Sequence, residues 1–207
     1  MAEIQQEICP IAADDLFIIM DHPNAIFEYP IHCHPEYEIN LVIDTNGTRV
    51  IGDSEETFDG LDFVMVGPYI PHVWKATNNE NRVITIQFSR EILNFEILNK
   101  RLFLPIKQLL LESIHGLHFF GQEAEHIKEE IVELTKIQGF HSATRFLNIL
   151  PSLAHAPRRK LVSNRYESES LIHQSKSRRI NKVCKYIEDN ISQKISLLDV
   201  RYTMILV

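Results

Sequence analysis

From Leu16 to Ser89 the sequence is a series of short apolar runs separated by turn residues. The runs, which are rich in β-branched and aromatic residues, are LFIIM, AIFEYPI, EINLVID, TRVIG, DFVMVG, HVWKA and RVITIQF. The segments between them, such as DHPN, DTNG, GDSEE, DGLD and TNNEN, hold the residues that turns favour. This close spacing is typical of antiparallel sandwiches and barrels. We therefore expect a small β-barrel of jelly-roll type in this half of the chain.

After Arg90 the apolar residues recur at the spacing of an α-helix. Three segments show this pattern: PIKQLLLESIHG (105–116), QEAEHIKEEIVELTKIQG (122–139) and SATRFLNILPSLAHA (142–156). The second segment carries Ala124, Ile127, Ile131 and Leu134 along one face. Such a stripe can cover the apolar outside of a sheet. Its spacing of three and four also suits pairing with the same helix of a second copy, so both interpretations stay open.

The residues from Pro157 onward differ in charge from the rest of the chain. They hold 11 Lys and Arg against 5 Asp and Glu, although the whole chain has a net charge of -7. An acidic body with a basic tail is typical of proteins that bind nucleic acid through the tail. A solvated basic linker has the same composition, so both interpretations stay open. Residues 157–177 lack a sustained period and predict a linker, whereas helical spacing returns in RRINKVCKYIEDN (178–190) and a capping pattern in SLLD (196–199).

The sequence gives no sign of export or of a membrane segment. Its N-terminus has no basic start, and no run of eighteen apolar residues occurs. The three cysteines, Cys9, Cys33 and Cys184, are odd in number and lack CxxC spacing. We therefore expect a cytoplasmic protein with free thiols and no membrane contact.

The stretch HCHPEYEIN brings His32, His34 and Glu38 close together in sequence. Side chains two apart share one face of a strand, and Pro35 can bend the chain so that Glu38 lies across from the histidines. His72 joins them if its segment forms a neighbouring strand. Such donors can hold a divalent metal, bind a small ligand, or simply be hydrogen-bonded histidines without a ligand.

These residues resemble the two cupin motifs. The pattern H-x-H-x3-E is followed by Gly47, and G-x7-P-x2-P-H runs from Gly60 to His72. In metal-binding cupins the corresponding positions, here His32, His34, Glu38 and His72, hold a divalent metal such as Fe, Mn, Ni or Zn. The sequence departs from the pattern in three ways: eight residues separate Glu38 from Gly47 instead of six, no inner glycine precedes His72, and Ala76 replaces the usual asparagine.

The chain as a whole resembles the AraC/XylS family of transcriptional regulators. A cupin-like segment, helices, a basic linker and RINKVCKYIEDNISQKISLLDV follow one another in that family's order. The resemblance implies a mainly β plus α fold in four parts. These are a cupin-like (jelly-roll) effector-binding barrel in residues 1–100, a helical dimerisation segment in 101–156, a linker in 157–177 and a partial helix-turn-helix unit in 178–207.

The resemblance implies a regulator that binds DNA, senses a small-molecule effector such as a sugar, and forms a homodimer. After Val200 the sequence RYTMILV stands where the family has a turn and its base-reading helix. We therefore expect specific DNA reading to be lost, with only phosphate contacts from a basic cluster: Arg178, Arg179, Lys182 and Lys185.

Within the barrel, the expected effector-binding residues are His32, His34, Glu38, His72 and Trp74. Trp74 could stack on a sugar or another planar apolar surface, or belong to the core. Arg49 and Arg82 could meet an anionic effector, but we expect both at the surface. The remaining histidines, including His115 and His118, are expected to be surface or capping residues. Two other functions stay open: a metal-dependent cupin enzyme, such as a dioxygenase or isomerase, and a binding module that forms heterodimers with a full-length form.

Overall fold

The computed structural model describes residues 4–12, 14–76 and 80–163, together with Val183, Tyr186, Asn190, Ser196 and Leu197. The chain divides into two compact units, residues 1–166 and 167–207. The helices expected in 178–207, and with them Arg178, Arg179, Lys182 and Lys185, lie outside the continuously described ranges.

The first unit combines a large sheet with helices, as the sequence predicts in outline. Within the described residues, nine strands form the sheet: β1 (Gln5–Gln6), β2 (Phe17–Pro23), β3 (His32–Cys33), β4 (Tyr37–Ile51), β5 (Ser54–Val66), β6 (His72–Ala76), β7 (Arg82–Phe88), β8 (Leu117–Phe119) and β9 (Arg158–Lys160). The three α-helices there are α1 (Leu104–Glu112), α2 (Gln122–Leu134) and α3 (Phe140–His155). Short 3-10 helices are η1 (Arg90–Asn94), η2 (Glu96–Asn99), η3 (Arg101–Phe103) and η4 (Ser113–His115).

The long hairpin of β4 and β5 organises the sheet. β4 pairs with β5 along nearly its whole length, while its other edge pairs first with β7 over residues 37–43 and then with β6 over residues 47–51. The change of partner coincides with a register shift between Ile43 and Thr45, where Asp44 has a positive φ of 59°. A bulge of this kind bends a strand and reverses which residues face each side.

This bend explains why two segments predicted to be turns lie within strands. DTNG and DGLD were both predicted to be turns, but Thr45 pairs with Gly60 and Asn46 pairs with Asp59. The two turn-like segments lie opposite each other inside one continuous hairpin. Gly60, with φ of 78°, supplies the conformation that the bend requires. The run at residues 25–31, also expected as a strand, is irregular throughout and lies between β2 and β3.

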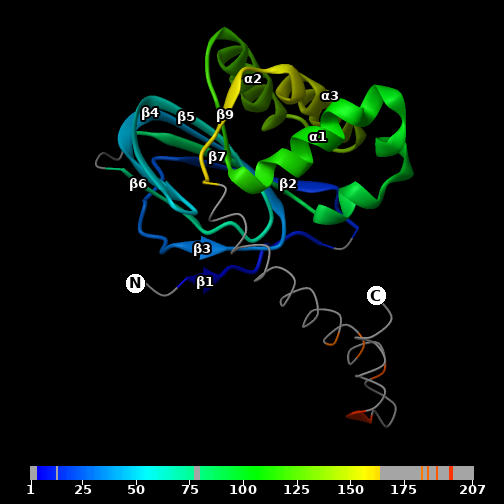
Figure 1. Cartoon of the computed structure of the whole chain (residues 1–207). Coiled ribbons are helices and arrows are strands. Elements are labelled where there is room, and N and C mark those ends of the chain that lie inside the picture. The colour runs from blue at the N-terminus through cyan, green and yellow to red at the C-terminus, as the bar shows by residue number, and fades with distance from the viewer. Residues whose placement is uncertain are drawn as a thin grey trace. The chain divides into compact units, whose positions relative to one another are not determined.

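One face of the sheet packs against the helices (Figure 1). Tyr37, Ile39 and Leu41 alternate along β4 and join the side chains of all three helices in one buried cluster. The stripe Ala124, Ile127, Ile131 and Leu134 is part of the same cluster and is almost wholly buried. The prediction that the stripe covers the sheet is confirmed. The alternative, a dimer contact through these four side chains, stays a prediction; within this chain they pack in the protein's own core.

The opposite side of the sheet, which we name the inner face, holds a second and smaller apolar cluster. It contains Val42, Ile51, Val64 and Trp74. Strand β9, which lies at the start of the expected linker, extends the sheet by pairing with β8. Val162, just beyond β9, is buried in the same inner cluster.

Two other expectations concern membranes and thiols. Among the described residues, no helix combines the length and apolar character needed to cross a membrane. Cys9 and Cys33 are free thiols, as predicted.

Candidate functional site

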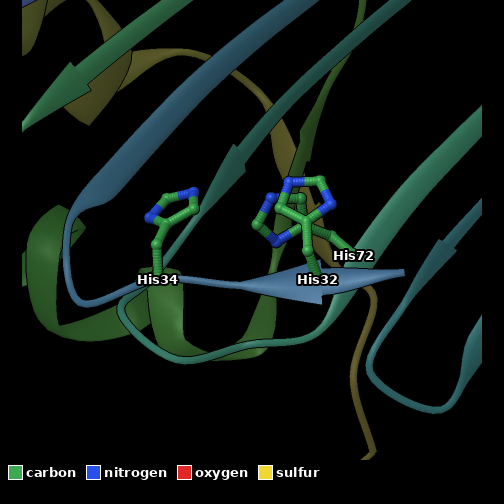
Figure 2. Close-up of side chains that lie close together, drawn as sticks. All are labelled: His32, His34 and His72. Atoms are coloured by element: carbon green, nitrogen blue, oxygen red, sulfur yellow. The ribbon is translucent and has the colours of Figure 1, made fainter. Parts of the chain in front are cut away.

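Three histidines meet on the inner face at the edge formed by β3 and β6. His32 pairs directly with His72 across these strands. His34 follows β3, and its ring extends from the same side of the chain as that of His32 (Figure 2). The ring centroids of His32 and His72 are 4.3 Å apart, and those of His34 and His72 are 5.0 Å apart. The convergence predicted from the sequence is therefore observed.

Glu38 completes the set that the cupin resemblance implies. The chain bends between β3 and β4 at Pro35, which places Glu38 across from the histidines. Its two oxygens lie 3.0 Å from Nε2 of His34 and 3.7 Å from Nε2 of His72. Gln87 on β7 donates a hydrogen bond to Glu38 at 3.1 Å. The carboxylate is thus fixed in place and points at two imidazoles.

The backbone fixes the tautomers of two histidines. Nδ1 of His32 lies 2.9 Å from the carbonyl oxygen of Pro30, and Nδ1 of His72 lies 2.7 Å from that of Ile70. A carbonyl oxygen only accepts, so each Nδ1 carries a proton, and in the neutral form of either ring it is Nε2 that presents a lone pair to the cluster. Metal-binding histidines are usually oriented by such contacts. Nε2 of His72 is buried and has no hydrogen-bond partner among the described residues.

The charges within the cluster differ from residue to residue. Burial lowers the pKa of His72 to about 4, so its ring is neutral near pH 7. Burial also opposes the charge on His34, but its close contacts with Cys9, Glu36 and Glu38, the last through a hydrogen bond of 3.0 Å, outweigh it and raise its pKa to about 12. For Glu38, burial is outweighed by the nearby His72 and His34, and its pKa falls to about 2. A metal ion would displace the proton on His34, as metal binding to imidazole requires.

Several cluster residues were not found from the sequence. Glu7 lies 3.6 Å from Nε2 of His32 through its Oε2 atom, and Cys9, Glu36 and Gln87 are also close. Three are separated from the H-x-H-x3-E motif by strands or loops. Glu36 lies inside that motif at one of its unspecified positions, although it has the same parity as His34 and Glu38 on a regular strand.

A pocket of about 470 Å³ adjoins the cluster on the inner face. Its walls include His22, Asn24, Phe27, Tyr29, His32, Asn40, Val73, Trp74 and Val83. Of the five residues expected to bind an effector, His32 and Trp74 line this pocket. His34, Glu38 and His72 lie in the cluster instead. The indole nitrogen of Trp74 donates to Asp62 at 2.7 Å, which fixes the orientation of the ring.

Arg49 corrects a prediction. It was expected at the surface, but its side chain is only 2% exposed and forms ion pairs with Asp62 and Glu56. The bulge at residues 43–45 is the reason, since it turns the odd-numbered residues of β4 towards the inner face. Arg82, by contrast, is partly exposed and donates two hydrogen bonds to Asp21.

Two histidines expected at the surface are also more enclosed than predicted. His115 is buried, and His118 is half-buried beside Asp62. Burial, with the nearby charges of Arg49 and Arg159, lowers the pKa of His118 to about 4. The Glu56 carboxylate also accepts two hydrogen bonds from Arg159 on β9, at 2.7 and 2.6 Å. A chain of polar contacts thus runs from Trp74 to β9.

The comparisons with known proteins identify a shared fold. No protein-family model and no curated protein match the chain. Its structure is similar to that of ToxT from Vibrio cholerae. For apo ToxT of strain SCE256 the TM-score is 0.51 and the identity 11%, over 90% of this chain and 69% of that chain.

Two further ToxT structures give lower scores. ToxT of strain O395 has a TM-score of 0.47 at 10% identity, over 89% of this chain and 68% of that chain. Wild-type ToxT with a bound unsaturated fatty acid has a TM-score of 0.37 at 11% identity, over 89% and 67%. At such identities the likeness with apo ToxT shows the fold alone.

Proposed function

We propose that the first unit is the effector-sensing domain of an AraC-type transcriptional regulator, and that its inner face belongs to a cupin-like barrel. The fold shared with ToxT, an AraC-family regulator, supports this proposal. The order of barrel, helices and basic C-terminal segment in the sequence supports it independently. DNA binding by the C-terminal unit, a homodimer and a cytoplasmic location belong to the same proposal.

The pocket beside Trp74 carries the proposal. Its volume of about 470 Å³ falls within the range of small-molecule sites, about 300–1,000 Å³. Phe27, Val73 and Val83 give it an apolar wall, while Asn40 and His32 offer hydrogen bonds. Such a site suits a ligand with one apolar face and a few polar groups. A sugar that stacks on Trp74 meets this description, and an unsaturated fatty acid, which ToxT binds, is the second class to test.

Effector binding would act by linkage. A ligand that binds one conformation of the regulator more tightly shifts the population towards it. The polar chain from Trp74 through Asp62, Arg49 and Glu56 ends at Arg159 on β9, just before the segment that leads to the C-terminal unit. The proposed mechanism is that occupancy of the pocket changes the placement of the DNA-binding units through this strand.

Tryptophan fluorescence tests the proposal directly, because Trp74 is the only tryptophan of the chain. Titration of the full chain with monosaccharides and with an unsaturated fatty acid should give a saturable change for one class. By calorimetry, Trp74→Ala should weaken that binding at least about tenfold, since aromatic contacts supply much of a ligand's affinity. The matched control Leu102→Ala, at a residue 82% exposed, should leave it unchanged. Absence of saturable binding in both classes would contradict the proposal.

The second candidate function is a metal-dependent cupin enzyme. The preset tautomers of His32 and His72, and the buried Nε2 of His72 without a hydrogen-bond partner among the described residues, favour it. The donor atoms of His32, His34 and His72 all lie within 4.8 Å of one another. These histidines and Glu38 would hold a divalent ion, which supplies Lewis-acid or redox chemistry.

Metal analysis of the purified protein tests the enzyme candidate. Near-stoichiometric Fe, Mn, Ni or Zn, lost in the His34→Ala and Glu38→Ala variants, supports it. A metal-free protein that still binds an effector overturns it.

A further inference from the structure

The N-terminal segment reaches the histidine cluster. Strand β1 pairs in parallel with β3, so that Gln5 lies beside His32 and Gln6 beside Cys33. The amide of Glu7 continues this pairing by donating to the carbonyl oxygen of Cys33 at 3.0 Å. The pairing covers only two residues, both exposed. It holds Glu7 next to the imidazoles, although 25 positions separate it from His32 in the sequence.

Glu7 contacts the same ring atoms that would bind a metal. Its Oε2 atom lies 3.6 Å from Nε2 of His32 and 3.9 Å from Nε2 of His34. Ligand atoms about 2.0–2.2 Å from a shared ion lie roughly 3–4 Å from each other. Glu38 adjoins His34 and His72 at 3.0 and 3.7 Å. The two carboxylates therefore adjoin different pairs of histidines, and Gln87 donates to both, at 3.4 Å to Glu7 and 3.1 Å to Glu38.

We propose that Glu7 is a further metal ligand and that a divalent ion in the histidine cluster fastens the N-terminal strand β1 to β3. This inference rests on the metal-binding candidate described above, and adds a residue outside the cupin motifs. An ion held by Glu7 and the histidines joins the N-terminal segment to the barrel more strongly than two exposed residue pairs can. Metal occupancy then controls whether residues 4–9 stay docked beside the histidines.

Glu36 provides a control because its carboxylate contacts a different atom. Its Oε2 atom lies 3.5 Å from Nδ1 of His34, the ring nitrogen that does not face Glu38. Glu36 therefore orients the His34 ring and does not face the position that a metal ion would occupy. Glu7 is partly exposed, with 23% of its side chain accessible, so the Glu7→Gln variant should fold normally.

The experiment uses Zn²⁺ alone with the full chain and two readouts. Calorimetry gives the zinc affinity, and hydrogen exchange measures the protection of residues 4–9 with and without zinc. In the wild type, zinc should bind and slow exchange at the Glu7 amide. In Glu7→Gln the affinity should fall at least about tenfold, because loss of even an indirect partner of a metal ligand has that effect. The zinc-dependent protection should also disappear.

The control variants separate the explanations. Glu36→Gln should retain zinc-dependent protection of residues 4–9, and His72→Ala should lose zinc binding. Unchanged affinity and protection in Glu7→Gln would overturn the role of Glu7 while leaving the histidine site intact. Loss of zinc in Cys9→Ser but not in His72→Ala would place the ion among Glu7, Cys9 and His34, and would also overturn the proposed arrangement. Failure of the wild type to bind zinc overturns the metal site, whereas effector binding at Trp74 is measured separately.

Discussion

Replacement of Arg49 by methionine is expected to destabilise the protein far more than an ordinary surface substitution. Its guanidinium is buried, and the Asp62 side chain with which it pairs is wholly buried. Methionine keeps the length of the side chain but removes the positive charge. Asp62 then keeps the hydrogen bond from Trp74 and the neighbouring His118 ring at 3.7 Å, but loses its cationic partner. Its carboxylate must either stay charged while buried or take up a proton.

The expected loss follows from this burial. Removing one partner of a buried ion pair costs about 3–5 kcal/mol, because the other charge is left uncompensated. Arg82→Met is the matched control: this arginine also lies on a strand and donates two hydrogen bonds to one aspartate, but both side chains are about a third exposed. Pairs of that kind contribute about 0–1 kcal/mol.

Urea denaturation followed by far-ultraviolet circular dichroism measures both losses. Circular dichroism is preferable to fluorescence here because Trp74 is bonded to Asp62 and would report local changes. The double variant Arg49→Met with Asp62→Asn should recover most of the lost stability, since it also removes the uncompensated charge of Asp62. Equal and small losses for Arg49→Met and Arg82→Met would refute the buried pair and the bend that produces it.

Three further predictions test the core, the hairpin and the surface charges. Ile131→Ala should lower the free energy of unfolding by about 2–5 kcal/mol. The control Leu111→Ala, at a residue 52% exposed, should change that free energy by less than about 0.5 kcal/mol. If Ile131→Ala instead shifts the oligomeric state on size-exclusion chromatography without loss of stability, a dimer contact through this helix face is favoured. Gly47→Ala should lower the melting temperature, because its methyl group would collide with the facing carbonyl oxygen on β6; an unchanged temperature would contradict that close approach. Hydrogen bonds from Arg82 lower the pKa of Asp21 below 3.8, so the charged Asp21 stabilises the fold above that pH, and this stabilisation is lost as the pH falls through the folded-state pKa. The difference in melting temperature between wild type and Asp21→Asn should therefore shrink from pH 7 to pH 3. A difference that stays constant would count against this ion pair.

The positions of helices and strands could be predicted from the sequence better than the bends and strand pairings that connect them. Apolar spacing located the three helices and most strands, because both patterns depend on neighbouring residues. The bend at Asp44 was missed, since DTNG has turn residues whether the chain reverses or merely bulges. That bulge reverses the alternation along β4, which explains why Arg49 is buried.

The candidate site shows the same division. His32, His34 and Glu38 lie within one short stretch, and Pro35 indicated the bend that brings them together. His72 was expected to join them if its segment formed a neighbouring strand, and the cupin resemblance gave it the same role. Glu7 and Gln87 reach the cluster through strand pairings β1–β3 and β4–β7, and a single sequence gives no local signal for these pairings.

The most direct test of the account is anomalous diffraction at the zinc absorption edge from crystals of the full chain soaked in Zn²⁺. The inner face gathers His32, His34 and His72 around one shared position. We therefore predict a strong peak at about 2.0–2.1 Å from Nε2 of each of these histidines, the usual zinc–nitrogen distance. Zinc found only elsewhere, or three imidazoles that point to separate places, would contradict it.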